Sequence, residues 1–153
     1  MNTPMRVAAV CVRLIGAGTG WAAPSGAAGI DPALKGLPTI ADLPAGAVQV
    51  SPVIPAMGSH WERPQDRPNG PIYCVINGRI VCAEFAVSLQ NLKGLKEFSD
   101  IQWPLQNGKR LPPLNHLDLN PEPHGHPGFT VPHYDLHMYF VPPEARFLAQ
   151  GER

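Results

Sequence analysis

The segment Pro-His-Tyr-Asp-Leu-His-Met-Tyr-Phe at residues 132–140 decides the expected fold. Aromatic and apolar residues fill it and prolines bound it on both sides, which predicts a β-strand. Side chains two residues apart on a strand share a face, so we expect His133, Asp135 and His137 to point one way. The alternate residues are aromatic or apolar, and we expect them to bury the opposite face.

A β-hairpin is predicted at residues 71–85, because two arms rich in β-forming residues flank Asn77-Gly78. Cys74 and Cys82 lie on either side of this turn. A plain two-residue turn places them on opposite faces, whereas a bulge brings both onto one face. We favour a disulfide because an oxidising compartment is expected, and the alternative is a pair of buried thiols.

Composition indicates a single domain that is mainly β. The chain has 153 residues, and its 19 prolines and 15 glycines favour turns and extended connections over long helices. Leucines at spacings of three predict one short helix over residues 88–98, capped by Ser88. We therefore expect a small antiparallel sheet, barrel-like or packed as a sandwich, with that helix.

The N-terminus resembles a secretory signal peptide. Met1–Arg6 carries one positive charge, an apolar stretch follows from Val7, and small residues near Ala23 offer a cleavage site. We assign residues 1–23 to the signal peptide, 24–50 to an extended Pro/Gly/Ala-rich arm and 51–153 to the β-rich domain. The protein is then exported, periplasmic or secreted from a bacterium, with no membrane span after leader cleavage.

The charge pattern argues against a nucleic-acid partner. Twelve basic and twelve acidic residues give a formal net charge of zero, and the basic residues do not gather in one patch. The sequence also contains no Gly-x-Ser-x-Gly nucleophile motif, and no glycine-rich phosphate loop follows a predicted strand.

The residues best suited to chemistry form a candidate metal-ligand set of three histidines and one carboxylate. They lie in or beside predicted strands, and they are His60, Glu84, His133 and His137. Imidazole and carboxylate donors bind zinc, manganese, iron or nickel. Asp135 is expected to act behind them, holding an imidazole in its ligating tautomer.

The remaining histidines are predicted to lie outside this set. His124 and His126 have the spacing of a metal-binding pair, but they sit in a Pro/Gly-rich turn that is typical of a surface loop. His116 falls within the loop-rich stretch 103–123 and is expected to be structural or exposed.

Several of these motifs occur together in one order. They are Met57–Trp61, Pro71–Tyr73, Asn77-Gly78, Glu84-Phe85 and Pro132–Tyr139. In these motifs and their order, the chain resembles a family of small, often exported bacterial domains of unknown function, over roughly residues 55 to 141. The resemblance implies a β-rich, self-associating domain and assigns no activity.

Three functions are compatible with these observations. The chain is an exported metal-binding domain, a metal-dependent enzyme using the same site, or a homo-oligomeric interaction module without a metal. A converging ligand set supports the first two, and an open coordination position beside a pocket favours the enzyme. The third predicts that the imidazoles do not converge.

Overall fold

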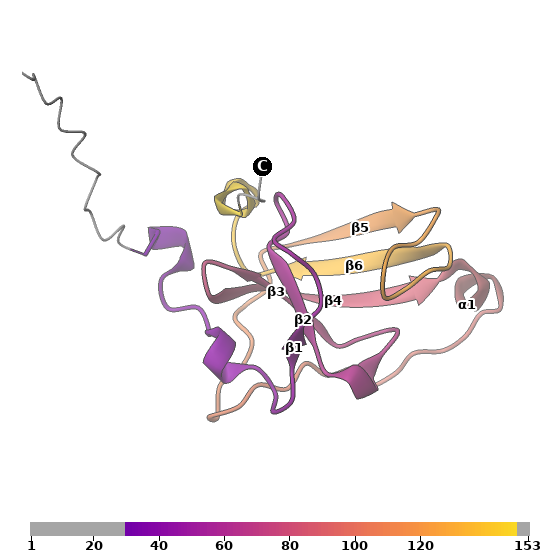
Figure 1. Ribbon diagram of the computed structural model, residues 1–153, viewed down its shortest axis with the longest axis horizontal. Helices are drawn as coiled ribbons and strands as arrows, with labels where there is room; N and C mark the ends of the chain where they lie inside the picture. Colours follow the sequence, from indigo (N-terminus) through magenta and orange to yellow (C-terminus); the bar gives the residue numbers. More distant parts are fainter. Residues whose placement is uncertain (1–29, 150–153) are drawn as a thin grey trace, which may run out of the picture.

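The computed structural model describes residues 30–149, which form one six-stranded antiparallel sheet (Figure 1). Its strands are β1 (Val48–Gln49), β2 (Ser59–Glu62), β3 (Ile72–Ile76), β4 (Arg79–Ser88), β5 (His116–Glu122) and β6 (His133–Tyr139). They lie in the order β1-β2-β3-β4-β6-β5. The expected mainly β fold is confirmed, and the sheet is open, not closed into a barrel. The predicted signal peptide lies outside the described residues.

Strand β4 joins the two halves of the sheet. Its first part pairs with β3 over residues 79–84, and residues 82–88 pair with β6. In Figure 1, β4, β6 and β5 run side by side, while β1 and β2 cross them more steeply. This twist lets side chains from β2, β4 and β6 approach one another above one face of the sheet.

The predicted hairpin contains both a two-residue turn and a bulge. Asn77 and Gly78 both have positive φ, 48° and 73°, as the common hairpin turn requires. The register shifts beyond the turn, and Val81 is left without a partner on β3. The shift places Cys74 directly opposite Cys82, with their Cα atoms 4.9 Å apart, and the predicted disulfide joins them.

Strand β5 lies where the sequence predicted a loop-rich stretch. Residues 116–122 pair with β6 along their whole length, although Pro121 lies within them. Proline removes a backbone donor, so it is tolerated on an edge strand, whose outer side has no partner. β5 is such an edge, and Leu117 and Leu119 point outward from it, about half-exposed.

The one α-helix among the described residues, α1 (Leu89–Lys93), is shorter than predicted. Ser88 caps it as expected, accepting a hydrogen bond from the Asn91 N–H at 3.1 Å. Gly94 ends it, and Leu95 follows with a φ of 53° and an exposed side chain. The chain thus leaves the helix at Gly94, and the spacing of leucines beyond it reflects no helical face.

Four short 3₁₀ helices complete the described elements. They are η1 (Pro32–Leu34), η2 (Ile40–Asp42), η3 (Pro64–Asp66) and η4 (Pro143–Leu148). Leu34 packs with the disulfide and Tyr139 in one apolar cluster, and Leu43 packs with Tyr73 in another. The arm predicted to lie outside the core therefore supplies a buried leucine to each cluster. No described helix is long and apolar enough to cross a membrane.

The two faces of β6 are buried in the opposite sense to that expected. His133, Asp135 and His137 share one face as predicted, and all three are buried. The alternate residues, which were expected to be covered, are only half-buried. The reason is tertiary, because the chain around residues 50–57 and 126–129 covers the polar face, as the lining of the pocket there shows.

Candidate metal centre

A pocket of about 590 Å³ lies over the polar face of the sheet. Glu84, Asp135 and His137, from β4 and β6, line it on the sheet side. β1 with the loop that follows it, the turn at residues 126–129 and residues 67–68 are among its other walls. Polar side chains of the sheet thus face a partly open pocket instead of an apolar core.

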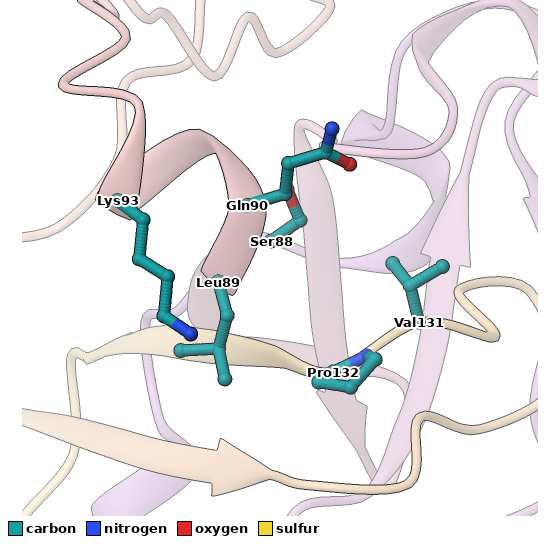
Figure 2. A pocket seen from close by; sticks show the side chains of 6 residues that line it. All are labelled: Ser88, Leu89, Gln90, Lys93, Val131 and Pro132. Carbon is teal, nitrogen blue, oxygen red and sulfur yellow. The ribbon is translucent and has the colours of Figure 1, made fainter.

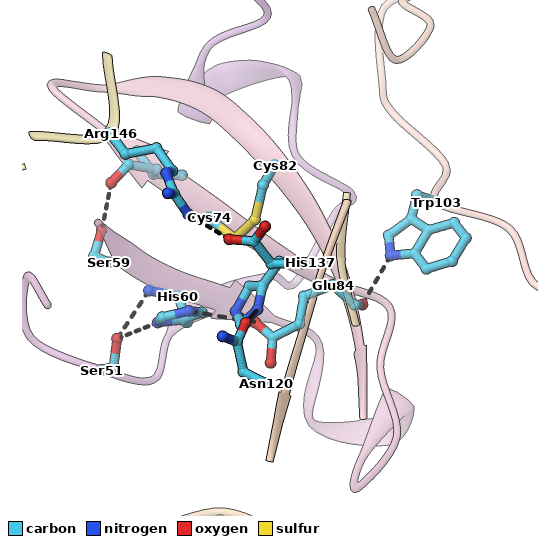
Figure 3. Close-up of a disulfide and its surroundings, with 12 residues drawn as sticks. Ser51, Ser59, His60, Cys74, Cys82, Glu84, Trp103, Asn120, His137 and Arg146 are labelled. Atoms are coloured by element: carbon cyan, nitrogen blue, oxygen red, sulfur yellow. Dashed lines mark hydrogen bonds and ion pairs between the residues drawn. A yellow bond between two sulfur atoms is a disulfide. The ribbon is translucent and has the colours of Figure 1, made fainter. Parts of the chain in front are cut away.

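Three side chains from three strands converge in this pocket. His60 comes from β2, Glu84 from β4 and His137 from β6, and we call them the deep triad (Figure 3). Glu84 Oε2 lies 3.3 Å from His60 Nε2 and 3.6 Å from His137 Nε2. All three residues are buried, so the structure brings together three of the four predicted ligands.

Hydrogen bonds behind the two rings fix how they face the carboxylate. The Ser51 hydroxyl donates to the Pro52 carbonyl, so its oxygen accepts from His60 Nδ1 at 2.9 Å. His137 Nδ1 lies 3.0 Å from the side-chain oxygen of Asn120, which accepts its hydrogen. With the hydrogens on both Nδ1 atoms, each neutral ring turns an Nε2 lone pair toward Glu84, which is the ligating tautomer.

Burial favours the neutral form of every group in the deep triad. It lowers the pKa of His60 and of His137 to about 4, and for His60 the nearby imidazoles contribute to this lowering. It raises the pKa of Glu84 well above its usual value, with Asp135 adding to the effect. Glu84 Oε2 also makes no hydrogen bond. A bound cation would pair with this oxygen and favour the ionised form of the carboxyl group.

Cys74 is the fourth potential donor beside the deep triad, and the sequence did not mark it as one. Its sulfur and the three ligand atoms all lie within 4.8 Å of one another. The disulfide with Cys82 occupies that sulfur, and a metal binds the thiolate form. Three protein ligands, His60, Glu84 and His137, therefore face the pocket.

The fourth predicted ligand, His133, does not join the deep triad. Four residues on an extended strand span about 13 Å, so His133 and His137 point the same way without reaching one ion. His133 instead lies with Asp135 and His126, and we call these three residues the mouth triad. Asp135, expected to support the ligands from behind, is thus a potential ligand.

His126 is the functional candidate that the sequence reasoning missed. It was predicted to lie in a surface loop, and its side chain is indeed 41% exposed, but its ring lies close to His133 and Asp135. The His-x-His spacing with His124 did not identify this role, because His124 belongs to neither triad. His116 is structural, with its ring stacked on Tyr139 at 4.8 Å.

A second pocket, of about 420 Å³, lies between α1 and the segment before β6 (Figure 2). Ser88, Leu89, Lys93 and Pro132 are among its lining residues. Its lining contains no histidine, cysteine or carboxylate, so this pocket offers no metal ligands.

Comparison with known proteins supports the fold and assigns no activity. No protein-family model matches the chain, and no curated protein matches it. The chain is similar in structure to a hypothetical protein, TTHB210, from Thermus thermophilus, with a TM-score of 0.55 and 23% sequence identity. The match covers 67% of this chain and 87% of that one. At this identity the likeness shows the fold alone, and the resemblance to a bacterial family stays a prediction.

Proposed function

We propose that this protein binds a divalent transition metal through His60, Glu84 and His137. A tetrahedral ion with bonds of 2.0–2.2 Å holds neighbouring ligand atoms about 3.3–3.6 Å apart. The Nε2–Oε2 distances of 3.3 and 3.6 Å in the deep triad match this spacing. The buried Glu84 oxygen without a hydrogen bond is the observation that carries the proposal, because a native fold rarely leaves such an atom unsatisfied.

The donor set limits the ion. Two imidazoles and one carboxylate suit zinc, manganese, iron or nickel, whereas calcium and magnesium prefer all-oxygen sites. The hydrogen bonds from His60 to Ser51 and from His137 to Asn120 support this assignment, since metal-bound histidines nearly always donate through the other ring nitrogen.

The proposed setting is outside the cytoplasm. The disulfide between Cys74 and Cys82 supports an oxidising compartment, where such bonds persist. Together with the signal-peptide pattern of the N-terminus, it favours an exported metal-binding protein of the periplasm or the secreted fraction.

A metal-dependent enzyme is the second candidate, and the pocket of about 590 Å³ favours it. Three protein ligands leave a position for water, and a catalytic zinc lowers the pKa of such a water to about 7. The bound ion would then face a space large enough for a small substrate. Hydrolysis or hydration is the reaction type that this arrangement supports.

Elemental analysis of the purified full-length protein tests the proposal, alongside His137→Ala and His124→Ala variants. We expect the wild type and the His124→Ala control to retain the metal of the deep triad, and His137→Ala to lose it. Metal at 100 times its dissociation constant should raise the free energy of unfolding by about 2.7 kcal/mol. Wild-type protein that takes up no metal and is not stabilised by zinc would contradict the proposal and favour the interaction module.

A further inference from the structure

We propose that His126, His133 and Asp135 form a second divalent-metal site, at the mouth of the same pocket. The mouth triad shares no ligand with the deep triad, so neither proposal depends on the other. It combines two residues of β6 with one residue of the turn before that strand. Three observations carry the inference: the distances, the orientation of the rings and the unsatisfied carboxylate.

The three ligand groups have the spacing of a coordination sphere. His133 Nε2 lies 3.1 Å from His126 Nε2 and 3.2 Å from Asp135 Oδ1. His126 Nε2 lies 3.4 Å from Asp135 Oδ2. All three separations fall within the range of ligand–ligand distances around a tetrahedral or octahedral ion with bonds of 2.0–2.2 Å, which is about 2.8–3.6 Å.

Backbone carbonyls fix the tautomer of both rings. His133 Nδ1 lies 2.6 Å from the Val131 carbonyl oxygen, and His126 Nδ1 lies 3.1 Å from that of Pro127. A carbonyl oxygen only accepts, so both Nδ1 atoms carry a hydrogen and donate it. The two Nε2 lone pairs then face each other and the carboxylate. This arrangement is repulsive unless a positive charge lies between them.

The carboxylate of the mouth triad is buried and lacks a full set of partners. Asp135 is 5% exposed, and its Oδ1 makes no hydrogen bond despite its closeness to His133. A buried acceptor without a donor costs about 1–3 kcal/mol, and more when it is charged. A bound cation removes this cost, as it does for Glu84 in the deep triad.

The turn that carries His126 is closely packed against its surroundings. The backbones of His126 and Phe129 exchange two hydrogen bonds, at 3.0 and 3.1 Å, and the Phe129 ring stacks on His133 at 4.4 Å. Gly125 has a φ of +67°, and a Cβ there would lie 2.6 Å from the backbone of Thr130. The fold therefore holds His126 over β6, although its side chain is partly exposed.

The two triads are expected to hold separate ions. Asp135 and His137 are two residues apart on β6, which corresponds to about 7 Å along a strand. Metal pairs that share a substrate oxygen lie only about 3.5–4 Å apart. The mouth triad is the more accessible site, because His126 reaches solvent, so its ion should exchange faster than the ion of the deep triad.

A shared proton is the competing occupant of the mouth triad. One imidazolium between His126 and His133 would also relieve the repulsion, and it would need no metal. The two occupants differ in stoichiometry, since only the metal adds a second equivalent per chain.

Titration of metal-stripped full-length protein with Co²⁺ separates these cases, read by elemental analysis and by the visible absorption of the bound ion. We expect two equivalents in the wild type, one in His126→Ala, one in His137→Ala and none in the double variant. The His124→Ala control, altered two residues before His126 and outside both triads, should keep two. Loss of a direct ligand should weaken metal binding at that site by at least 100-fold, more than loss of a residue that only hydrogen-bonds to a ligand.

The outcomes distinguish the two proposals. If the wild type binds one equivalent that His137→Ala removes and His126→Ala keeps, the mouth site is overturned and the deep site stands. If His126→Ala removes the only equivalent, the deep site is overturned instead. Because His126 is partly exposed, its substitution should leave the fold intact, and urea denaturation of the metal-free variant checks this.

Discussion

Tyr139 and His137 lie two residues apart on the same face of β6 and are equally buried, at 1% and 2% exposure. Tyr139 packs against the ring of His116, with the ring centroids 4.8 Å apart, and against the Arg146 guanidinium, 4.9 Å from its centroid. His137 faces Glu84 and the pocket. Burial alone therefore does not separate a residue that stabilises the fold from one that holds a ligand, and the neighbours decide.

The same division runs along the whole polar face. At the disulfide end, defined by Cys74, Cys82 and Tyr139, the face is dry and packed against η1 and η4. At the pocket end, defined by Glu84 and His137, it is polar and hollow. We infer that the packed end holds the strands in place while the hollow end keeps ligands free for a metal.

Tyr139→Ala should cause the largest loss of stability, about 3–5 kcal/mol, because it leaves a cavity in a packed cluster. Urea denaturation of the metal-free protein measures it. His137→Ala is the matched control and should cost clearly less, since its side chain borders a pocket that already exists. Equal losses would contradict the division between the two ends.

The double variant Cys74→Ala/Cys82→Ala should lose about 2–3 kcal/mol, as expected for a cross-link across eight residues of sequence. Urea denaturation beside the wild type is the measurement. An unchanged midpoint would mean that the packed end does not depend on its cross-link.

Cys82→Ser should tighten zinc binding by about tenfold, or about 1.4 kcal/mol. The substitution frees the Cys74 sulfur, which lies in the ligand group of the deep triad, to bind as a thiolate. Competition with a chromophoric chelator measures the dissociation constant. Cys74→Ser is the matched control, because it also breaks the disulfide but frees Cys82 instead. Equal affinities in the two variants would argue against Cys74 as a latent ligand.

Glu84→Gln should give the smallest effect, a gain of about 1 kcal/mol in the metal-free protein at pH 7. Burial raises the pKa of Glu84 in the folded state, so the unfolded chain loses this proton first. The resulting destabilisation is absent below the unfolded pKa near 4.5 and grows as pH rises toward the folded pKa. Urea denaturation between pH 4 and 8 should show this slope in the wild type and a flatter one in Glu84→Gln. Glu97→Gln, at an exposed position, is the matched substitution, and a slope unchanged by Glu84→Gln would refute the assignment.

Local rules predicted the parts of the fold that local forces make. The Asn77-Gly78 turn, the Ser88 cap and the alternation of β6 each follow from conformational preferences within a few residues. β5 was not predicted because proline is normally excluded from strands. Pro121 is tolerated only because β5 lies at the edge of the sheet.

The candidate site was only partly predictable. His60, Glu84 and His137 were selected by residue type, and the twist of the sheet brings them together. The separation of His133 from His137 follows from strand geometry and was within reach of the sequence. The role of His126 could not be predicted from the sequence, because a turn has no periodicity that indicates where its side chains point.

The sequence by itself determined the hairpin of β3 and β4, the strand β6 and which side chains of β6 share a face, since these depend on backbone preference and a two-residue period. Only the tertiary structure decided which face is buried and which histidines meet. Those outcomes depend on contacts between residues distant in sequence, such as the turn at 126–129 folding over β6. As a result, the histidines and carboxylates form two triads, where the sequence predicted a single ligand set.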